Sequence, residues 1–172
     1  MVGLARGKVL LEPYNSSWKT EFETEKERLL AHLGDENEII LHIGSTAIPG
    51  MVAKPIIDIL LISDQVSADF WQQQLGGLGY QHRENGDNDD SIFFAKGGEA
   101  MRTHYLRITY PHSKTHIGTI YFRDTLRTSK ELADKYEKLK EELAGKYPDQ
   151  RQEYSQGKIP FIKSVLADHP HL

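Results

Sequence analysis

Residues 42–50 read HIGSTAIPG, and residues 54–61 read KPIIDILL. The first run predicts an apolar strand that ends at Gly44 and Ser45 and then turns at a Pro-Gly pair. The second run predicts another apolar strand with Asp58 in its middle. Glycine lets a bound group approach the backbone closely, a serine hydroxyl can donate a hydrogen bond, and a carboxylate without a partner is costly to bury. The pattern therefore predicts a site for a phosphate group and a metal ion.

The sequence around this motif predicts a sheet that is covered by helices. Residues 38–43 and 56–62 are nearly continuous apolar runs, which is typical of strands buried on both faces. An amphipathic helix is expected from Trp18 to Leu33, because apolar residues recur on one helical face and Gly34 ends the run. Further strands are expected at 9–12, 80–83, 91–95 and 103–110, and a further helix at 68–75.

The C-terminal third predicts a helical segment. Thr128 and Glu131 have the spacing of a capping box, and apolar residues follow at helical intervals until a Tyr-Pro pair. A last helix is expected from about residue 149, with Pro160 kinking or restarting it. Residues 117–126 fit a strand by propensity and a helix by their position, so both assignments stay open.

Length and composition define the class of protein. The chain is most simply one domain, residues 1–172, and its 38% hydrophobic and 27% charged residues are typical of a soluble globular protein. The predicted fold class is mixed α/β (α+β), with a central mixed sheet, flanking helices and a C-terminal helical segment. The chain has no cysteine, which excludes disulfides and thiolate metal sites and is compatible with the cytoplasm. The net charge of −4 and the lack of a membrane-length apolar run predict no nucleic-acid groove and no membrane partner, and the oligomeric state stays open.

The central motif resembles the signature of the nucleotidyltransferase superfamily, which places Gly-Ser after one strand and a carboxylate on a strand soon after. The finer resemblance is to the GrpB family, whose run His-Ile-Gly-Ser-Thr-Ala-x-Pro-Gly leads to Lys-Pro-Ile-Ile-Asp-Ile, and this chain has it at 42–50 and 54–59. The resemblance implies a cytoplasmic, nucleotidyltransferase-like domain that is sometimes joined to dephospho-coenzyme A kinase. It covers most of the chain and includes Pro13, Tyr14, Trp18, Phe22, Arg102, Thr103, His104, Phe122, Arg123, Asp124, Leu126, Arg127, Tyr136, Leu139, Lys140, Leu143, Tyr154, Lys158, Phe161 and Ile162.

The resemblance also implies roles for particular residues. In the superfamily the Gly-Ser turn holds the phosphates of a nucleoside triphosphate, and two or three acidic side chains hold the metal ions that drive phosphoryl transfer. For this chain it implies Asp58 and Ser45 as catalytic residues, with Mg²⁺ on Asp58. The candidates for phosphate binding are Gly44, Ser45, Thr46, Lys54, Arg102 and Arg107. His42 and His104 are further candidates for the pocket.

The sequence departs in two ways from these patterns, once from that of the superfamily and once from that of the family. Ile56 and Leu60 share a strand face with Asp58, where the pattern expects a second acid. The next strand offers no third carboxylate, and Tyr105 and Arg107 stand where the family pattern is richer in histidine. A second carboxylate about 4–5 Å from Asp58 would favour an enzyme, and its absence would favour binding alone.

Three functions therefore stay open. The first is Mg²⁺-dependent nucleotidyl transfer from a nucleoside triphosphate to an acceptor that the sequence does not identify. The second is noncatalytic binding of a nucleotide, or of a metabolite related to coenzyme A, as the small phosphorylated partner. The third is metal-dependent hydrolysis, which needs His42, His104 and Asp58 to meet at one ion. Without any ligand, Gly44 and Ser45 also fit a tight connection, and Asp58 also fits a structural acid that backbone N–H groups or Arg107 satisfy.

Overall fold

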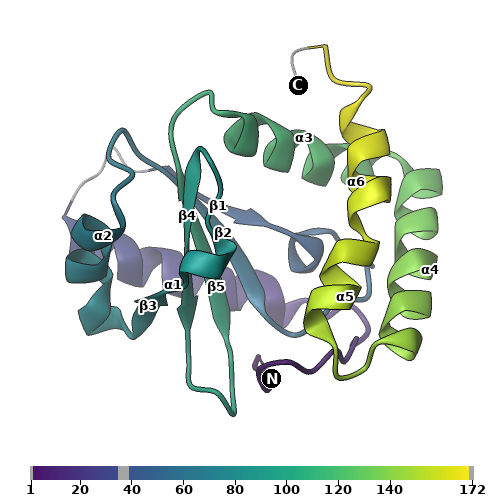
Figure 1. The fold of residues 1–172 in the computed structure, drawn as a ribbon, viewed down its shortest axis with the longest axis horizontal. Helices are drawn as coiled ribbons and strands as arrows, with labels where there is room; N and C mark the ends of the chain where they lie inside the picture. Colours follow the sequence, from purple (N-terminus) through teal and green to yellow (C-terminus); the bar gives the residue numbers. More distant parts are fainter. Residues whose placement is uncertain (1, 35–38, 171–172) are drawn as a thin grey trace.

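The computed structural model describes residues 2–34 and 39–170, and these form a mixed five-stranded sheet (Figure 1). The strand order is β1-β2-β5-β4-β3, in which β2 and β5 run parallel and every other neighbouring pair is antiparallel. The strands are β1 (Ile39–Ile43), β2 (Ile57–Ile62), β3 (Tyr80–His82), β4 (Ser91–Lys96) and β5 (His104–Thr109).

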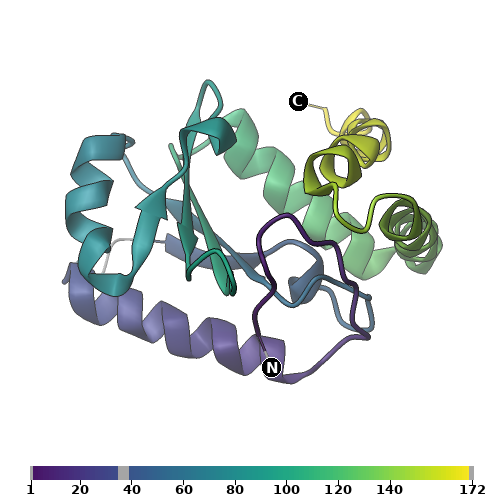
Figure 2. The same ribbon diagram turned by 60° about the horizontal axis from the view of Figure 1, so that its bottom comes forward.

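Helices cover both faces of this sheet (Figures 1 and 2). On one face lie α1 (Ser17–Leu33) and α2 (Ala68–Leu75), and their side chains join the main apolar core. On the other face α3 crosses near β1, and the remaining C-terminal helices follow it. These helices are α3 (Lys114–Thr128), α4 (Lys130–Lys146), α5 (Arg151–Gly157) and α6 (Ile159–Leu166). The predicted mixed α+β class and the C-terminal helical segment are confirmed.

The alternation of side chains along β2 decides where the central motif points. Ile57, Ile59 and Leu61 belong to the core under α1. Because successive residues of a strand face opposite sides, Asp58 and Leu60 lie on the other face. Leu60 packs there with β1 and α3, and Asp58 lies on the side of the C-terminal helices.

Several predicted boundaries need correction. Residues 9–12 do not form a strand, and only Glu12 makes an isolated bridge, to Ala53, because this segment runs along the loop before β2 instead of joining the sheet. The cap of α4 is Ser129, one residue after the predicted capping residue, and its hydroxyl accepts a hydrogen bond from the Leu132 amide. Residue 38 of the first predicted motif strand lies outside the described residues.

Other assignments agree with the sequence pattern. Residues 117–126, which fitted either element, belong to helix α3, which the Ser113 side chain caps at its N-terminus. Pro160 lies in the first turn of α6, so it restarts the helix after α5 ends at Gly157. None of the described helices combines the length and apolar character that a membrane span needs.

Candidate functional site: a cationic cavity around Asp58

The turn after β1 lies directly against the Asp58 carboxylate. Ile43 is opposite Asp58 in the antiparallel β1–β2 pair, so the next residue, Gly44, begins the turn beside it. Gly44 has φ +70° and ψ −172°, a combination that is essentially restricted to glycine. A Cβ at Gly44 would lie 2.4 Å from Asp58 Oδ2. Gly44 therefore permits both the backbone conformation and the close approach of the carboxylate.

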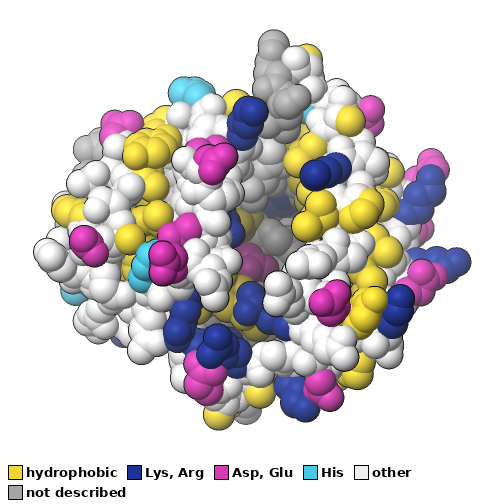
Figure 3. Space-filling view, in the orientation of Figure 1, with side chains coloured by type: hydrophobic (Ala, Val, Ile, Leu, Met, Phe, Trp, Pro, Cys, Tyr) yellow, Lys and Arg dark blue, Asp and Glu magenta, His cyan; other side chains and the backbone are white. Residues whose placement is uncertain are grey.

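Asp58 opens into a cavity of about 330 Å³ between the sheet and α5. We call it the Asp58 cavity. Figure 3 shows the surface hollow between the sheet and the C-terminal helices, with Lys and Arg side chains gathered along its edge. The polar and aromatic residues that line the Asp58 cavity are Ser45, Thr46, Lys54, Asp58, Phe93, Tyr105, Arg107, Arg151, Tyr154, Ser155 and Lys158.

Cations outnumber carboxylates in this cavity. Lys54, Arg107, Arg151 and Lys158 all contribute to its wall, and Asp58 is the single carboxylate among its described lining residues. The Asp58 carboxylate makes no hydrogen bond or ion pair with any residue that the structure describes. Burial raises the pKa of Asp58, and the four cations, of which Lys54 acts most strongly, oppose that rise. The cavity therefore carries an excess of positive charge.

The two lysines are held against one aromatic ring. Lys54 Nζ lies 5.5 Å and Lys158 Nζ 4.6 Å from the centre of the buried Tyr154 ring. Burial lowers the pKa of Lys54 to about 7, with further repulsion from Lys158 and Arg151. Burial also lowers the pKa of Lys158 to about 8, although the charge of Asp58 opposes this. A bound anion would remove part of this penalty, because it would supply the missing negative charge.

Three further predicted residues line the same cavity and also have protein partners. The Ser45 side chain interacts with the Tyr136 phenol, and this interaction opposes the rise in pKa that burial gives Tyr136. Thr46 Oγ1 lies 2.9 Å from His42 Nε2, within hydrogen-bonding distance. Arg107 donates to Ser91 Oγ and its guanidinium carbon lies 5.2 Å from the centre of the Phe93 ring. These contacts fix the orientation of the side chains that face the cavity.

Arg102 does not line the Asp58 cavity, contrary to the prediction. Its guanidinium donates to the Gly97 carbonyl at 2.6 Å and to the Glu99 carboxylate at 2.7 Å. The residue lies before β5, where it forms an isolated bridge with Leu4. Its position outside the regular strand places it at a neighbouring cavity instead.

The two candidate histidines lie away from Asp58. The His42 ring stacks on Phe22 of α1 at 4.7 Å, and His104 is buried on the α1 face of β5. Burial is the main cause that lowers the pKa of each histidine to about 4. Because β2 lies between β1 and β5, and because side chains alternate along each strand, His42, His104 and Asp58 cannot share one ion. The arrangement required for a histidine-based metal hydrolase is therefore contradicted.

The donor set around Asp58 also does not fit a two-metal site. Leu60 occupies the position two residues after Asp58 on the same face, and Arg107 projects from the neighbouring strand. Within residues 2–34 and 39–170, no group of three or more His, Asp or Glu side chains has a geometry that could hold a metal ion. The four cations around this single carboxylate also repel a divalent metal ion, so the residues present do not fit a two-metal site.

Sequence reasoning assigned no role to the residues that α5 and its C-cap, Lys158, contribute. Arg151, Tyr154, Ser155 and Lys158 all line the Asp58 cavity. They are spaced at i, i+3, i+4 and i+7, which places them on one helical face. This pattern of basic and aromatic residues is visible in the sequence and could have indicated a functional helix face. It does not indicate which surface of the protein the helix packs against.

Comparison with known proteins connects this architecture to a family. The model of the family described as GrpB protein matches residues 8–168. The chain is 37% identical to UPF0157 protein YqkA of Bacillus subtilis, over 92% of this chain but only 46% of that protein. It is 33% identical to glutamate-rich protein GrpB of Alkalihalophilus pseudofirmus, over 98% of this chain and 99% of that protein. The chain thus spans less than half the length of YqkA.

Among solved structures, the chain is similar to a GrpB protein and, more distantly, to a poly(U) polymerase. The crystal structure of the conserved protein GrpB from Enterococcus faecalis has a TM-score of 0.82 and 31% identity, and the match covers 92% of this chain and 96% of that one. The MgGTP-bound structure of Cid1 poly(U) polymerase has a TM-score of 0.51 and 12% identity, and the match covers 78% of this chain and 44% of that one. The second likeness concerns the fold alone and confirms the predicted nucleotidyltransferase-like architecture. The extent of the family match and the identity to full-length relatives show that this chain belongs to the GrpB family.

Proposed function

We propose that the Asp58 cavity binds the phosphate group of a nucleotide or of another small phosphorylated metabolite. The observation that carries this proposal is the convergence of Lys54, Lys158, Arg107 and Arg151 on one carboxylate. Burial lowers the pKa of Lys54 and of Lys158, and repulsion from neighbouring cations adds to this effect, so a negative charge in the cavity is favoured. A dianionic phosphate supplies that charge and accepts hydrogen bonds from ammonium and guanidinium groups. We further propose a cytoplasmic location, which the cysteine-free sequence supports.

The lysines and arginines supply the positive charge that metal ions supply in metal-dependent phosphoryl-transfer sites. No donor among the described residues forms a hydrogen bond with Asp58, so its carboxylate is available to accept one from a ligand hydroxyl. Asp58 also borders a mostly apolar cavity of about 420 Å³ between β1, α3 and α6, to which Ile43, Phe122 and Ile162 contribute. That cavity provides space for an uncharged part of the ligand next to the phosphate.

Nucleotidyl transfer is the second candidate function. The Gly44-Ser45 turn beside a carboxylate on β2, together with the nucleotidyltransferase-like fold, favours it. The two candidates differ in what they require of Asp58. A transferase needs its negative charge for a metal ion, whereas an anion-binding site is weakened by that charge because it repels phosphate.

Asp58→Asn distinguishes the two candidates. We expect the variant to bind nucleotides in EDTA roughly tenfold more tightly than the wild type, because the substitution removes a negative charge beside the phosphate site, and tenfold is about 1.4 kcal/mol. Calorimetric titration with mono-, di- and triphosphate nucleotides, with Mg²⁺ and with EDTA, measures this, and a product assay on every binder measures turnover. Asp69→Asn is the matched control, because Asp69 is exposed on α2 across the sheet.

Two results would contradict the binding proposal. One is binding that requires Mg²⁺ and is lost in Asp58→Asn, together with turnover of a triphosphate, which would establish the transferase. The other is an absence of binding to every member of the panel. Unchanged affinity in the Asp69→Asn control is needed before either result is assigned to Asp58.

The affinity of the cavity for anions is expected to fall as the pH rises. Lys54 and Lys158, whose pKa values are lowered to about 7 and about 8, are largely charged at pH 6 and largely neutral at pH 9. Sulfate is a suitable probe because its own charge is constant over this range, and we expect its affinity to fall by roughly tenfold or more. Calorimetry across this range measures the profile. Lys54→Arg should make the affinity depend less on pH, since a guanidinium stays charged. An affinity of the wild type for sulfate that does not change with pH would contradict the assignment of these lysines to anion binding.

A further inference from the structure

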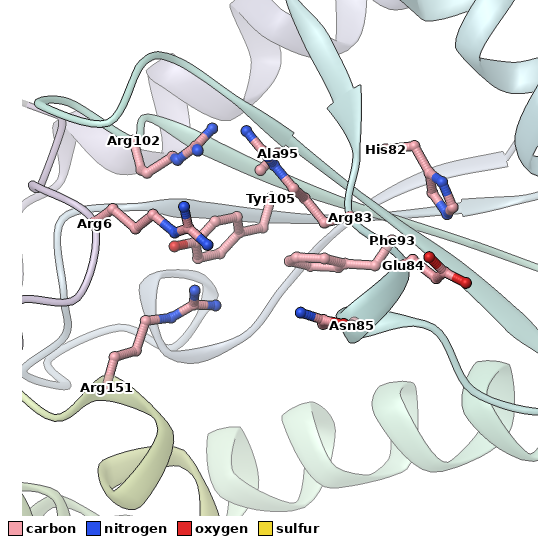
Figure 4. A pocket seen from close by; sticks show the side chains of 11 residues that line it. Arg6, His82, Arg83, Glu84, Asn85, Phe93, Ala95, Arg102, Tyr105 and Arg151 are labelled. Atoms are coloured by element: carbon pink, nitrogen blue, oxygen red, sulfur yellow. The ribbon is translucent and has the colours of Figure 1, made fainter.

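A second cationic cavity adjoins the Asp58 cavity. It has a volume of about 330 Å³, and Arg6, Arg83, Arg102 and Arg151 contribute to its wall. We call it the arginine cavity. Figure 4 shows these four guanidinium groups gathered around the Tyr105 ring, from the N-terminal segment, the β3–β4 connection, the segment before β5, and α5. Sequence reasoning singled out only one of them, Arg102, as a phosphate partner.

The two cavities share one wall, so a single ligand can extend from one into the other. Gly86, Phe93, Tyr105 and Arg151 line both. The Phe93 and Tyr105 rings lie 5.2 Å apart, and the Arg151 guanidinium carbon lies 4.9 Å from the Tyr105 ring centre. This wall is therefore aromatic and flanked by cations at the boundary between the two cavities.

The arginine cavity has fewer carboxylates than cations. Glu99 lies outside its lining and is shared by Arg102 at 2.7 Å, Arg6 at 3.0 Å and Arg83 at 4.0 Å. Glu84 is the single carboxylate among the described lining residues, and it points away from the group around Tyr105 (Figure 4).

Two of the arginines also have unused hydrogen-bond donors. The Nε atoms of Arg83 and Arg151 are buried and have no partner in the part of the chain that the structure describes. Burial, with repulsion from Arg102 and Arg6, lowers the pKa of Arg83, and Glu99 opposes this change. A buried donor without a partner is costly, and an anion that accepts from such a guanidinium satisfies it.

From these observations we infer that the arginine cavity is a second anion site, so that the ligand carries two separated anionic groups, one for each cavity. This inference rests on the proposed function of the Asp58 cavity and narrows its ligand to a doubly anionic metabolite. The part of the ligand between the two groups lies along Phe93 and Tyr105, which offer ring faces for a flat group.

Tungstate locates the two sites without any assumption about the rest of the ligand. We expect crystals of the full chain soaked in tungstate to show two anomalous peaks, one in each cavity. Arg83→Gln should lose the peak in the arginine cavity and retain the other. Arg6→Gln is a second variant with the same expected result, and its side chain is 56% exposed, so the substitution has little effect on folding.

A pair of matched nucleotides tests whether one ligand spans both sites. We expect adenosine 3′,5′-bisphosphate to bind the wild type roughly tenfold or more tightly than adenosine 5′-monophosphate, as expected for one added charge-assisted contact. Arg83→Gln should remove most of this advantage, and Lys19→Gln, an exposed change on α1, should leave it intact. Calorimetric titration measures all of these affinities.

The possible failures are distinguishable. A peak in the Asp58 cavity alone overturns the second site and leaves the proposed function standing, whereas no peak in either cavity overturns both. Two peaks with equal affinities for the two nucleotides overturn the single spanning ligand. Loss of the bisphosphate advantage in Lys19→Gln as well would assign that advantage to general charge and would also overturn the inference.

Discussion

Lys158→Met is expected to weaken the binding of phosphorylated ligands by roughly 10- to 100-fold, which is the loss of about one charge-assisted hydrogen bond. The same substitution is expected to raise the free energy of unfolding at pH 7 by about 1 kcal/mol or more, because it removes a cation that burial and Arg151 penalise. The methionine can keep the apolar contact with the Tyr154 ring. Calorimetry with the nucleotide panel and urea unfolding measure the two effects.

The opposite signs of these two effects make the test specific. If Lys158 had a structural role, its substitution would destabilise the protein and leave ligand binding unchanged. That outcome would contradict our account. Lys163→Met is the matched control, because Lys163 is exposed on α6, five residues further along the chain. We expect that control to leave both the affinity and the unfolding midpoint close to those of the wild type.

Gly44→Ala is expected to destabilise the protein by about 2–5 kcal/mol, from the sum of backbone strain and overpacking. The alanine would have to adopt φ +70°, and its Cβ would lie 2.4 Å from Asp58 Oδ2. The carboxylate cannot move without disturbing the β1–β2 turn or the cavity behind it. Urea unfolding gives the change in stability, and titration with the nucleotide panel gives the loss of affinity.

Gly145→Ala is the matched control for this prediction. Gly145 lies in helix α4, and a Cβ at that position would meet no atom within 4 Å. The same chemical change should therefore stabilise the protein there by about 0.5–1 kcal/mol, because alanine is a better helix former than glycine. If Gly44→Ala folds with wild-type stability, the close approach of Asp58 to this turn is not the constraint that we describe.

The central part of the site was predictable because it is formed by neighbouring segments of the chain. An apolar strand that ends in Gly-Ser and a second apolar strand shortly after it can pair as a hairpin, and the structure pairs Ile43 with Asp58. The period of two along β2 then decides that Asp58 faces away from the α1 core. Lys54 follows from the same segment, since it lies on the approach to β2.

The contribution of α5 was not predictable in this way. Arg151 and Lys158 are about 100 residues from Asp58 in the sequence, and their basic stripe is equally typical of a solvated helix face. Only the packing of α5 against the open face of the sheet brings them to the cavity. The excess of cations, which is the basis of the proposed function, therefore becomes visible only in three dimensions.

The misplaced residues have a physical explanation. His42 and His104 belong to strands that flank β2 on opposite sides, and each faces the α1 side while Asp58 faces the other. The sequence does not determine the order of the strands, so these two strands could be expected to be neighbours. Arg102 precedes β5, so the alternation of that strand does not decide the direction of its side chain.

The central claim, that buried lysines of the Asp58 cavity bind an anion, is tested most directly by NMR titration of the full chain labelled at lysine side chains. Inorganic phosphate is the probe, and the pKa values of Lys54 and Lys158 are measured with and without it, using Lys54→Arg and Lys158→Arg to assign the signals. Our account predicts that saturating phosphate raises both pKa values from about 7 and about 8 toward the ordinary range of lysine. The account would be contradicted if saturating phosphate left both lysine pKa values unchanged, or if the protein did not bind phosphate at all.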